Sequence, residues 1–217
     1  MRVRAGHVAI VVLAVLALAG SALAVASTDP KVALDRQGQA RARALLILRT
    51  DVGRGWRGDP VYQVSSQLSP VCPGYSPDLS SLVITGRADS KVFRLASSGT
   101  EQDVTTAVFV FRSAAQAKRM HTLTGVRFAR HCLHVGSVPG GKIDEVSALR
   151  LPASRVDAIG WRVRLVRTAA PTLLYADYVF LHAKAASVAV FFVSTNRPFP
   201  AAPEKHVLQV LRTRMSA

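Results

Sequence analysis

The chain has 217 residues, with 28 Lys and Arg against 13 Asp and Glu and a formal net charge of +15. In a cytoplasmic protein such a charge would suggest nucleic-acid binding, but the basic residues are scattered rather than packed into one run, which favours an ordinary solvated surface. Without its N-terminal apolar segment the chain keeps about 190 residues, enough for one domain with a substantial core.

The N-terminus has the three parts of a secretory signal sequence. Arg2 and Arg4 form a positive start, residues 8–25 form an apolar run, and the A-x-A pattern of cleavage sites occurs at 22–24 and again at 24–26. We therefore expect a cleaved signal peptide and a mature protein that is secreted or extracytoplasmic. The alternative is an uncleaved membrane anchor at 8–25, because this run of about 18 residues approaches the length that spans a bilayer.

Export changes what the positive charge implies. Loss of Arg2 and Arg4 leaves 26 Lys and Arg against 13 acidic residues, a net charge of +13 for the mature form. Outside the cell this charge is compatible with anionic polymers or anionic lipid head groups rather than with nucleic acid. We expect contact with a membrane only through the N-terminal segment, if that segment is not cleaved.

In the first half of the chain, helical spacing of apolar residues predicts a helix at 35–48 that is ended by glycines. Residues 57–80 have the Pro, Ser, Gly and Asp content of a loop. β-branched and aromatic runs then predict strands at 82–85, 91–95 and 104–111.

In the second half, Ser113 opens a helix that reaches Cys132, and Gln116 completes a capping box. Residues 136–141 follow as a Gly/Pro loop. Strands are then expected at 145–151, 160–168, 173–183 and 187–194. The last of these strands is almost wholly apolar and is expected at the centre of a sheet, and a final amphipathic helix is expected at 204–215.

The order helix, strands, helix, strands, helix is not a βαβ alternation. It predicts an α+β domain in which an antiparallel β-sheet meander is covered by helices packed on one face. We divide the chain into a signal peptide or anchor at 1–26, a linker at 27–39 and a single extracytoplasmic domain at 40–217. Because each half runs from strands to a helix, a diverged internal duplication is a further hypothesis.

Both cysteines follow the N-terminal segment, Cys72 in the expected loop and Cys132 on the inner face of the second helix. An even number of Cys in an exported chain indicates a disulfide. The alternative is a metal site, since His131, Cys132 and His134 are close in sequence, but neighbouring residues of a helix point in different directions. We expect the disulfide and no metal.

No catalytic motif survives a residue-by-residue test. Residues 136–142 have the glycines and the lysine of a P-loop, but Ile143 stands where Ser or Thr would hold magnesium. The G-x-S-x-G pattern is absent, and Asp144 and Glu145 would point to opposite faces of a strand. We therefore expect no catalytic residue, no cofactor and no enzymatic activity.

Aromatic residues on the expected strands could line a pocket or fill a closed core. They are Phe109, Phe111, Tyr175, Tyr178 and Phe191. Packing into a closed core is the more frequent fate of such residues. These residues are the candidates for a ligand pocket if the sheet and the helices leave one open.

Several segments together resemble a known family of exported actinobacterial proteins. They are ALL at 44–46, TDVGRGW at 50–56, CPGY at 72–75, SAAQA at 113–117 and the helix end at 132–133. The whole is similar to the extracytoplasmic sensor-like domains of the PknH/LpqN type, with a PsbP-like α+β fold. Val-Gly stands in the second segment where the family pattern prefers Leu-Pro. The shared motifs are structural and say little about activity.

The resemblance implies ligand or cell-envelope sensing and no agreed enzymatic role. We therefore expect an exported, non-enzymatic, sensor-like domain of the bacterial cell envelope, which binds an unknown small molecule, a lipid or an envelope protein. Two alternatives stay open: a small extracytoplasmic hydrolase with an unrecognised site, and a basic protein bound to anionic cell-wall polymers. A Ser or Cys paired with an oriented His in an open cleft would favour the hydrolase.

Overall fold

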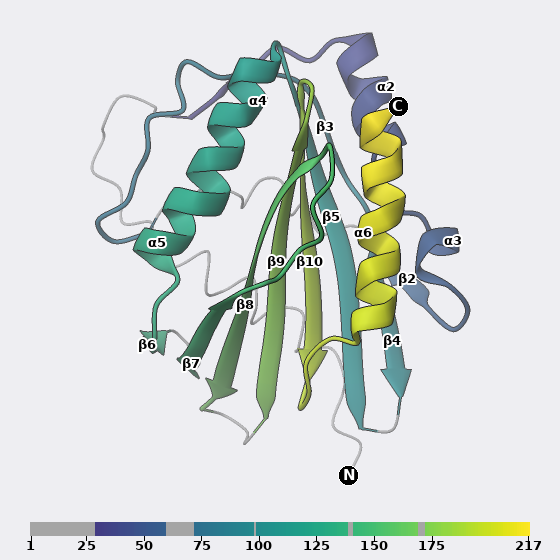
Figure 1. Ribbon diagram of the computed structural model, residues 1–217, viewed down its shortest axis with the longest axis vertical. Coiled ribbons are helices and arrows are strands. Elements are labelled where there is room, and N and C mark those ends of the chain that lie inside the picture. The colour runs from purple at the N-terminus through teal and green to yellow at the C-terminus, as the bar shows by residue number, and fades with distance from the viewer. Residues whose placement is uncertain (1–28, 60–71, 98, 139–140, 169–171) are drawn as a thin grey trace.

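The computed structural model describes residues 29–59, 72–97, 99–138, 141–168 and 172–217. The expected signal peptide, the alternative anchor and part of the expected loop at 57–80 lie outside these residues. Within the described residues ten strands form one sheet (Figure 1). Its strands are β1 (Lys31–Val32), β2 (Arg57–Asp59), β3 (Val83–Asp89), β4 (Val92–Ser97), β5 (Thr100–Phe111), β6 (Gly136–Val138), β7 (Gly141–Ala148), β8 (Asp157–Arg167), β9 (Leu173–Ala183) and β10 (Ala186–Thr195).

Several short helices and one long helix, α6, pack on the sheet. They are α2 (Arg36–Ala44), α3 (Arg49–Val52), α4 (Ala114–His121), the π-helical turn η3 (Thr122–Arg127), α5 (Phe128–Cys132) and α6 (Ala201–Ser216). α4, η3 and α5 follow one another without a break, and together they are the helix expected from Ser113 to Cys132. Pro203 lies in the first turn of α6, where its missing N–H has no helical partner to lose, so α6 begins earlier than expected.

The sheet confirms the expected α+β fold and its antiparallel meander. Its strand order is β1-β3-β5-β10-β9-β8-β7-β6, with β4 beside β5 and β2 beside β4. β1 runs parallel to β3, and the pairs from β6 through β10 are antiparallel neighbours in chain order. β10 lies between β5 and β9, in the central place expected for its apolar sequence. Of the segment that resembles a P-loop, residues 136–138 and 141–142 belong to the antiparallel pair β6–β7.

The expectation that the helices pack on one face is wrong, because they cover both faces. Val188 and Val190 of β10 belong to a core with residues of α2 and α6, whereas Ala189 and Phe191 belong to a second core with residues of α4 and η3. Figure 1 shows α4 and α6 to the two sides of the strands. A strand that is apolar in both directions needs cover on both faces, and this double pattern distributes the helices.

The folded domain begins within the stretch expected as a linker at 27–39, because β1 lies there and α2 starts there. β1 pairs with β3, and the Asp35 side chain caps α2 by accepting a hydrogen bond of 2.6 Å from the Gly38 N–H. α2 then packs backbone against backbone on β3. A Cβ added to Gly38 would stand less than 3.0 Å from the backbone of Thr85, and one added to Gly86 would do the same against Gly38.

The second helical segment begins as expected at Ser113, whose side chain accepts a hydrogen bond from the Gln116 N–H at 3.3 Å. Gln116 does not close a reciprocal capping box. Its Oε1 accepts from the Val83 N–H at 3.2 Å and its Nε2 donates to the Ser81 carbonyl at 3.0 Å, so this side chain fixes the helix to the start of β3. The Ser113 cap therefore depends only on neighbouring residues of the chain, whereas the partners of Gln116 come from a distant segment.

Cys72 and Cys132 form the expected disulfide, with an S–S distance of 2.05 Å and a Cα–Cα distance of 5.8 Å. Near it the ring of Tyr75 stacks on His131 with 4.9 Å between ring centroids. Tyr75 Oη also donates to the Leu123 carbonyl at 3.0 Å. The bridge and these contacts hold the segment before β3 against η3 and α5.

Candidate functional site

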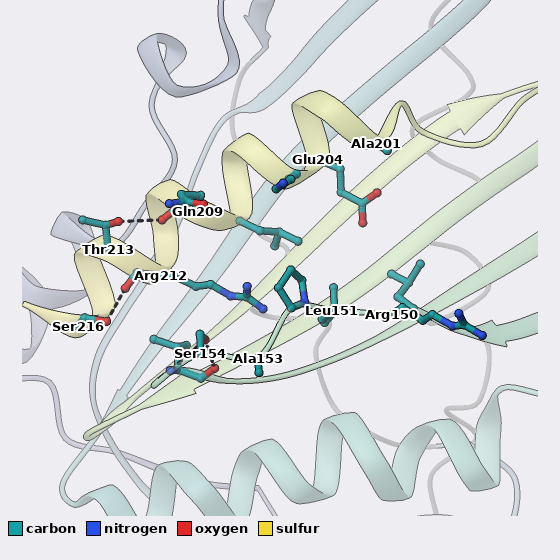
Figure 2. Close-up of a pocket in the computed structure, with 15 residues that line it drawn as sticks. Arg150, Leu151, Ala153, Ser154, Ala201, Glu204, Gln209, Arg212, Thr213 and Ser216 are labelled. Carbon is teal, nitrogen blue, oxygen red and sulfur yellow. Dashed lines mark hydrogen bonds between the residues drawn. The ribbon is translucent and has the colours of Figure 1, made fainter.

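A groove runs along one side of α6, between this helix and the β7–β8 connection at 149–156. Its volume is about 780 Å³, and Figure 2 shows residues from both sides of it. The helix contributes residues from Ala201 to Ser216 at intervals of one turn. Because a helix rises 1.5 Å per residue, this wall extends over about 22 Å. The shape suits an elongated ligand.

The amphipathic sequence of α6 explains why one stripe of the helix is available to a ligand. Val207, Leu211 and Met215 are buried against the sheet. Leu208 and Arg212, each one residue after a buried position, lie on the adjacent side of the helix and line the groove. Leu208 belongs to both, since it is buried in the core and also lines the groove. The floor of the groove is therefore continuous with the hydrophobic core.

The opposite wall is an irregular segment that is held close to β8. The Leu149 N–H donates to the Gly160 carbonyl at 2.9 Å. A Cβ on Gly160 would stand only 3.0 Å from Leu149 Cδ1 and 3.3 Å from Leu151 Cδ1, so the glycine lets both leucines lie flat on the strand. Ser154 Oγ accepts from the Val156 N–H at 3.2 Å and donates to the Val156 carbonyl at 2.8 Å, which closes a turn.

An acidic side chain, Glu204, lies at one end of the groove (Figure 2). Glu204 is buried, and its Oε2 lies 3.8 Å from Nη2 of Arg162. Arg162 is itself paired with the buried Asp177, to which its Nε and Nη2 each donate a hydrogen bond. Burial, helped by repulsion from Asp177 and opposed by Arg162, raises the pKa of Glu204 to about 7. Glu204 is therefore about half protonated near neutral pH.

A basic side chain, Arg212, enters the groove two turns further along α6. Figure 2 shows it reaching from the helix into the space in front of Leu151, Ala153 and Ser154. Its Nε and Nη2 atoms are buried and have no hydrogen-bond partner among the described residues. Buried donors of this kind are normally paired. The site therefore combines apolar walls with hydrogen-bond donors that have no acceptor within the described chain.

Four of the five aromatic candidates for a ligand pocket fill the core instead. Phe109, Phe111, Tyr178 and Phe191 are buried in the core beneath α4. Tyr178 meets Phe191 edge to face with 5.6 Å between ring centroids. The cavity that reaches Phe109 has a volume of about 20 Å³, which is about the space of one water molecule. These rings fill a closed core, which is the alternative weighed against a pocket.

Tyr175, the fifth of these residues, lies on the other face of the sheet. Side chains alternate along a strand, so Tyr175 shares a face with Asp177 and not with Tyr178. Tyr175 pairs in register with Arg164, whose Nε donates to Asp144 Oδ1 at 3.0 Å. Tyr175 thus belongs to the polar part of the sheet surface.

A Ser, a His and an Asp are aligned across three strands, a pattern that the sequence did not reveal. Ser187 is in register with His182, and His182 with Asp157. Ser187 Oγ donates to the Ala117 carbonyl at 3.3 Å, and His182 has 3.6 Å between its Nδ1 and the Asp157 carboxylate. Both nitrogens of His182 lack a hydrogen bond within the described chain. Ser187 and His182 are buried, and the cavity that Ser187 lines has a volume of about 20 Å³.

The described residues contain neither a candidate metal cluster nor a membrane-spanning helix. Among the residues that the structure describes, no three His, Cys, Asp or Glu side chains lie together as metal ligands. His131 stacks on Tyr75 and Cys132 is oxidised, so the His-Cys-Leu-His segment is used for structure. No helix within the described ranges is long and apolar enough to cross a membrane.

Sequence reasoning missed the groove and the places of Glu204 and Arg212 in it. The sequence pattern that could have indicated the groove is the spacing of Glu204, Leu208 and Arg212 at intervals of four residues, which places them along one side of a helix. The opposite wall has no such periodicity. That segment faces α6 only because β7, β8 and β9 bring it there.

Comparison with known proteins supports the fold. No family model matches the chain, and no curated protein matches it. Among solved structures, the chain is similar to the extracellular domain of PknH from Mycobacterium tuberculosis, with a TM-score of 0.52 and 11% sequence identity over 82% of this chain and 97% of that chain. The chain thus shares an α+β fold with that domain.

Proposed function

We propose that this protein is an exported, non-enzymatic, sensor-like domain of the cell envelope that binds its ligand in the α6 groove. The observation that carries the proposal is the groove itself, with apolar walls and with Arg212 donors that lack an acceptor in the described chain. Ligand sites in proteins combine mostly apolar walls with a few polar groups in this way.

The extracytoplasmic location is supported by two independent observations. The fold is similar to that of a domain described as extracellular. The Cys72–Cys132 disulfide is of the kind that persists in oxidising compartments outside the cytoplasm. The sensor-like role is a proposal from the same likeness and goes beyond the shared fold.

The non-enzymatic part of the proposal is supported by the surroundings of the aligned Ser187, His182 and Asp157. Ser187 Oγ donates away from His182, to a helix carbonyl. A nucleophile needs its base within hydrogen-bond reach and needs space for a substrate. In the groove, Glu204 and Arg212 are eight residues apart on α6, about 12 Å along the helix, and are suited to binding more than to a shared proton transfer.

The proposal is tested by filling the groove. Ala153 is exposed and lines the groove, so Ala153→Trp should block it without disturbing the core. Binding of the uncharged fluorescent probe N-phenyl-1-naphthylamine should raise its emission with the parent protein. We expect Ala153→Trp to weaken this binding by about tenfold or more, since the side chain occupies the ligand's space.

Ala202→Trp is the matched control, because Ala202 is exposed on α6 and does not line the groove. It should bind the probe as the parent does. Equal binding by the parent and Ala153→Trp would place the probe elsewhere and contradict the groove as the ligand site. Circular dichroism and thermal unfolding establish that both variants fold.

A further inference from the structure

We infer that the α6 groove accepts a single-chain amphiphile whose anionic headgroup, a carboxylate or a phosphate, pairs with Arg212. The inference rests on the proposed function, since it assigns a ligand class to the same groove. It depends on three features: the unpaired Nε and Nη2 atoms of Arg212, the charge balance of the groove and the apolar walls beside it.

The first feature is that, among the described residues, Arg212 lacks the acidic partner that other arginines on this side of the sheet have. Arg214, two residues further along α6, donates to both oxygens of Asp51 at 2.8 and 2.9 Å, and Arg162 is paired with Asp177. Arg212 has buried Nε and Nη2 atoms without an acceptor in the described chain. Leaving such donors unpaired is unfavourable, and a carboxylate or phosphate fits a guanidinium through two parallel hydrogen bonds.

The second feature is the excess of positive charge in the groove. Arg150, Lys205 and Arg212 line it, and Glu204 is the acidic residue among its lining residues. Glu204 is about 12 Å from Arg212 along the helix and lies beside Arg162 instead. Because its pKa is raised to about 7, it carries only part of a negative charge near neutral pH. An anion entering the groove therefore meets net attraction.

The third feature is the apolar surface between the two charged ends. Leu149, Leu151, Val156 and Leu208 line the groove, and Pro152 adds its ring. The groove extends over about 22 Å of helix. Its volume of about 780 Å³ lies within the range of sites that hold one small ligand. An acyl or alkyl chain would remove these side chains from water while its head stays at Arg212.

Isothermal titration calorimetry with the full secreted protein tests the inference. The probes are dodecyl phosphate, the uncharged dodecyl maltoside and inorganic phosphate, with the detergents kept below their critical micelle concentrations. We expect dodecyl phosphate to bind about tenfold or more tightly than either other probe. Arg212→Gln should weaken its binding by about 10- to 100-fold, the usual range for a lost charge-assisted pair, and Arg212→Lys by less.

Arg43→Gln on the exposed surface of α2 is the control, and it should leave binding unchanged. If the two detergents bind equally and Arg212→Gln changes neither affinity, the assignment of an anionic headgroup is overturned. The groove would then remain a ligand site. Equal binding of inorganic phosphate and dodecyl phosphate would overturn the amphiphile. Absence of binding by both detergents would overturn the inference, whereas the proposed function is decided separately by Ala153→Trp.

Discussion

At the scale of single residues, buried ionisable groups behave differently on the two faces of the sheet. On the α6 face, Asp177 and Arg162 neutralise each other, and Glu204 lies next to them with a raised pKa. On the α4 face, His121 lies 5.7 Å from His182 between ring centroids. Burial and repulsion from His182 lower the pKa of His121 from 6.5 to about 4, although the negative charge of Asp157 acts in the opposite direction.

The lowered pKa of His121 predicts acid sensitivity. The unfolded chain takes up a proton near pH 6.5, whereas the folded protein does so only near pH 4, so the contribution of His121 to stability is present above pH 6.5 and is lost as the pH falls to 4. The loss is about 2 kcal/mol, since partial exposure reduces the effect of the full shift. His121→Phe should remove this loss, measured as the free energy of unfolding in urea between pH 7 and pH 4.

Glu204 produces the opposite trend, and this must be separated from the effect of His121. Its raised pKa stabilises the folded protein below about pH 4.5, and that stability is lost as the pH rises through 7. The difference between His121→Phe and the parent at each pH cancels the contribution of Glu204. His206→Phe, at an exposed position of α6, should keep the pH profile of the parent. A His121→Phe profile parallel to that of the parent would contradict the assignment.

At the scale of elements, contacts between backbones decide where the first helix lies. Gly38 of α2 and Gly86 of β3 touch through their backbones. β3 also has a register shift against β5 between Ile84 and Gly86, which bends the strand at this contact. Two residues without side chains therefore allow α2 to approach the sheet closely and to cover its edge.

A side chain at Gly86 should push α2 away from β3. A Cβ there would collide with the Gly38 carbonyl, which is backbone and cannot move alone. We expect Gly86→Ala to lower the free energy of unfolding by about 1–3 kcal/mol, as overpacking does. Gly136→Ala is the control, because nothing lies within 4 Å of a Cβ at that position. Equal urea midpoints for the two variants would show that α2 adapts without cost.

At the scale of the whole molecule, the disulfide connects segments that secondary structure does not join. Cys72 precedes β3, and Cys132 ends α5 on the α4 face, 60 residues later in the chain. Leu79 and Leu82, between Cys72 and β3, are buried in the same core as Met120 and Leu123. The bridge thus fixes a non-regular segment over one end of that core.

Removal of the disulfide should destabilise the whole domain. Cys132→Ala is expected to lower the free energy of unfolding by about 2–5 kcal/mol, because the unfolded chain gains conformational freedom. The double variant Cys72→Ala/Cys132→Ala, which has no free thiol, should lose a similar amount and should not respond to reductant, whereas the parent should. A Cys132→Ala protein with the urea midpoint of the oxidised parent would rule out this role.

The amino-acid sequence alone determined the features that depend on near neighbours. Period-two and helical patterns located the main strands and helices, Ser113 marked a helix start, and the pair of cysteines in an exported chain predicted the bridge. Only the tertiary structure decided which faces the helices cover, that the rings of Phe109 and Phe191 close a core, and that Arg212 faces the segment at 149–156. The reason is physical. A hydrophobic pattern indicates which side of a helix or strand is apolar, because it depends on neighbouring residues alone. A groove depends on which distant segment the register of the sheet places opposite that side.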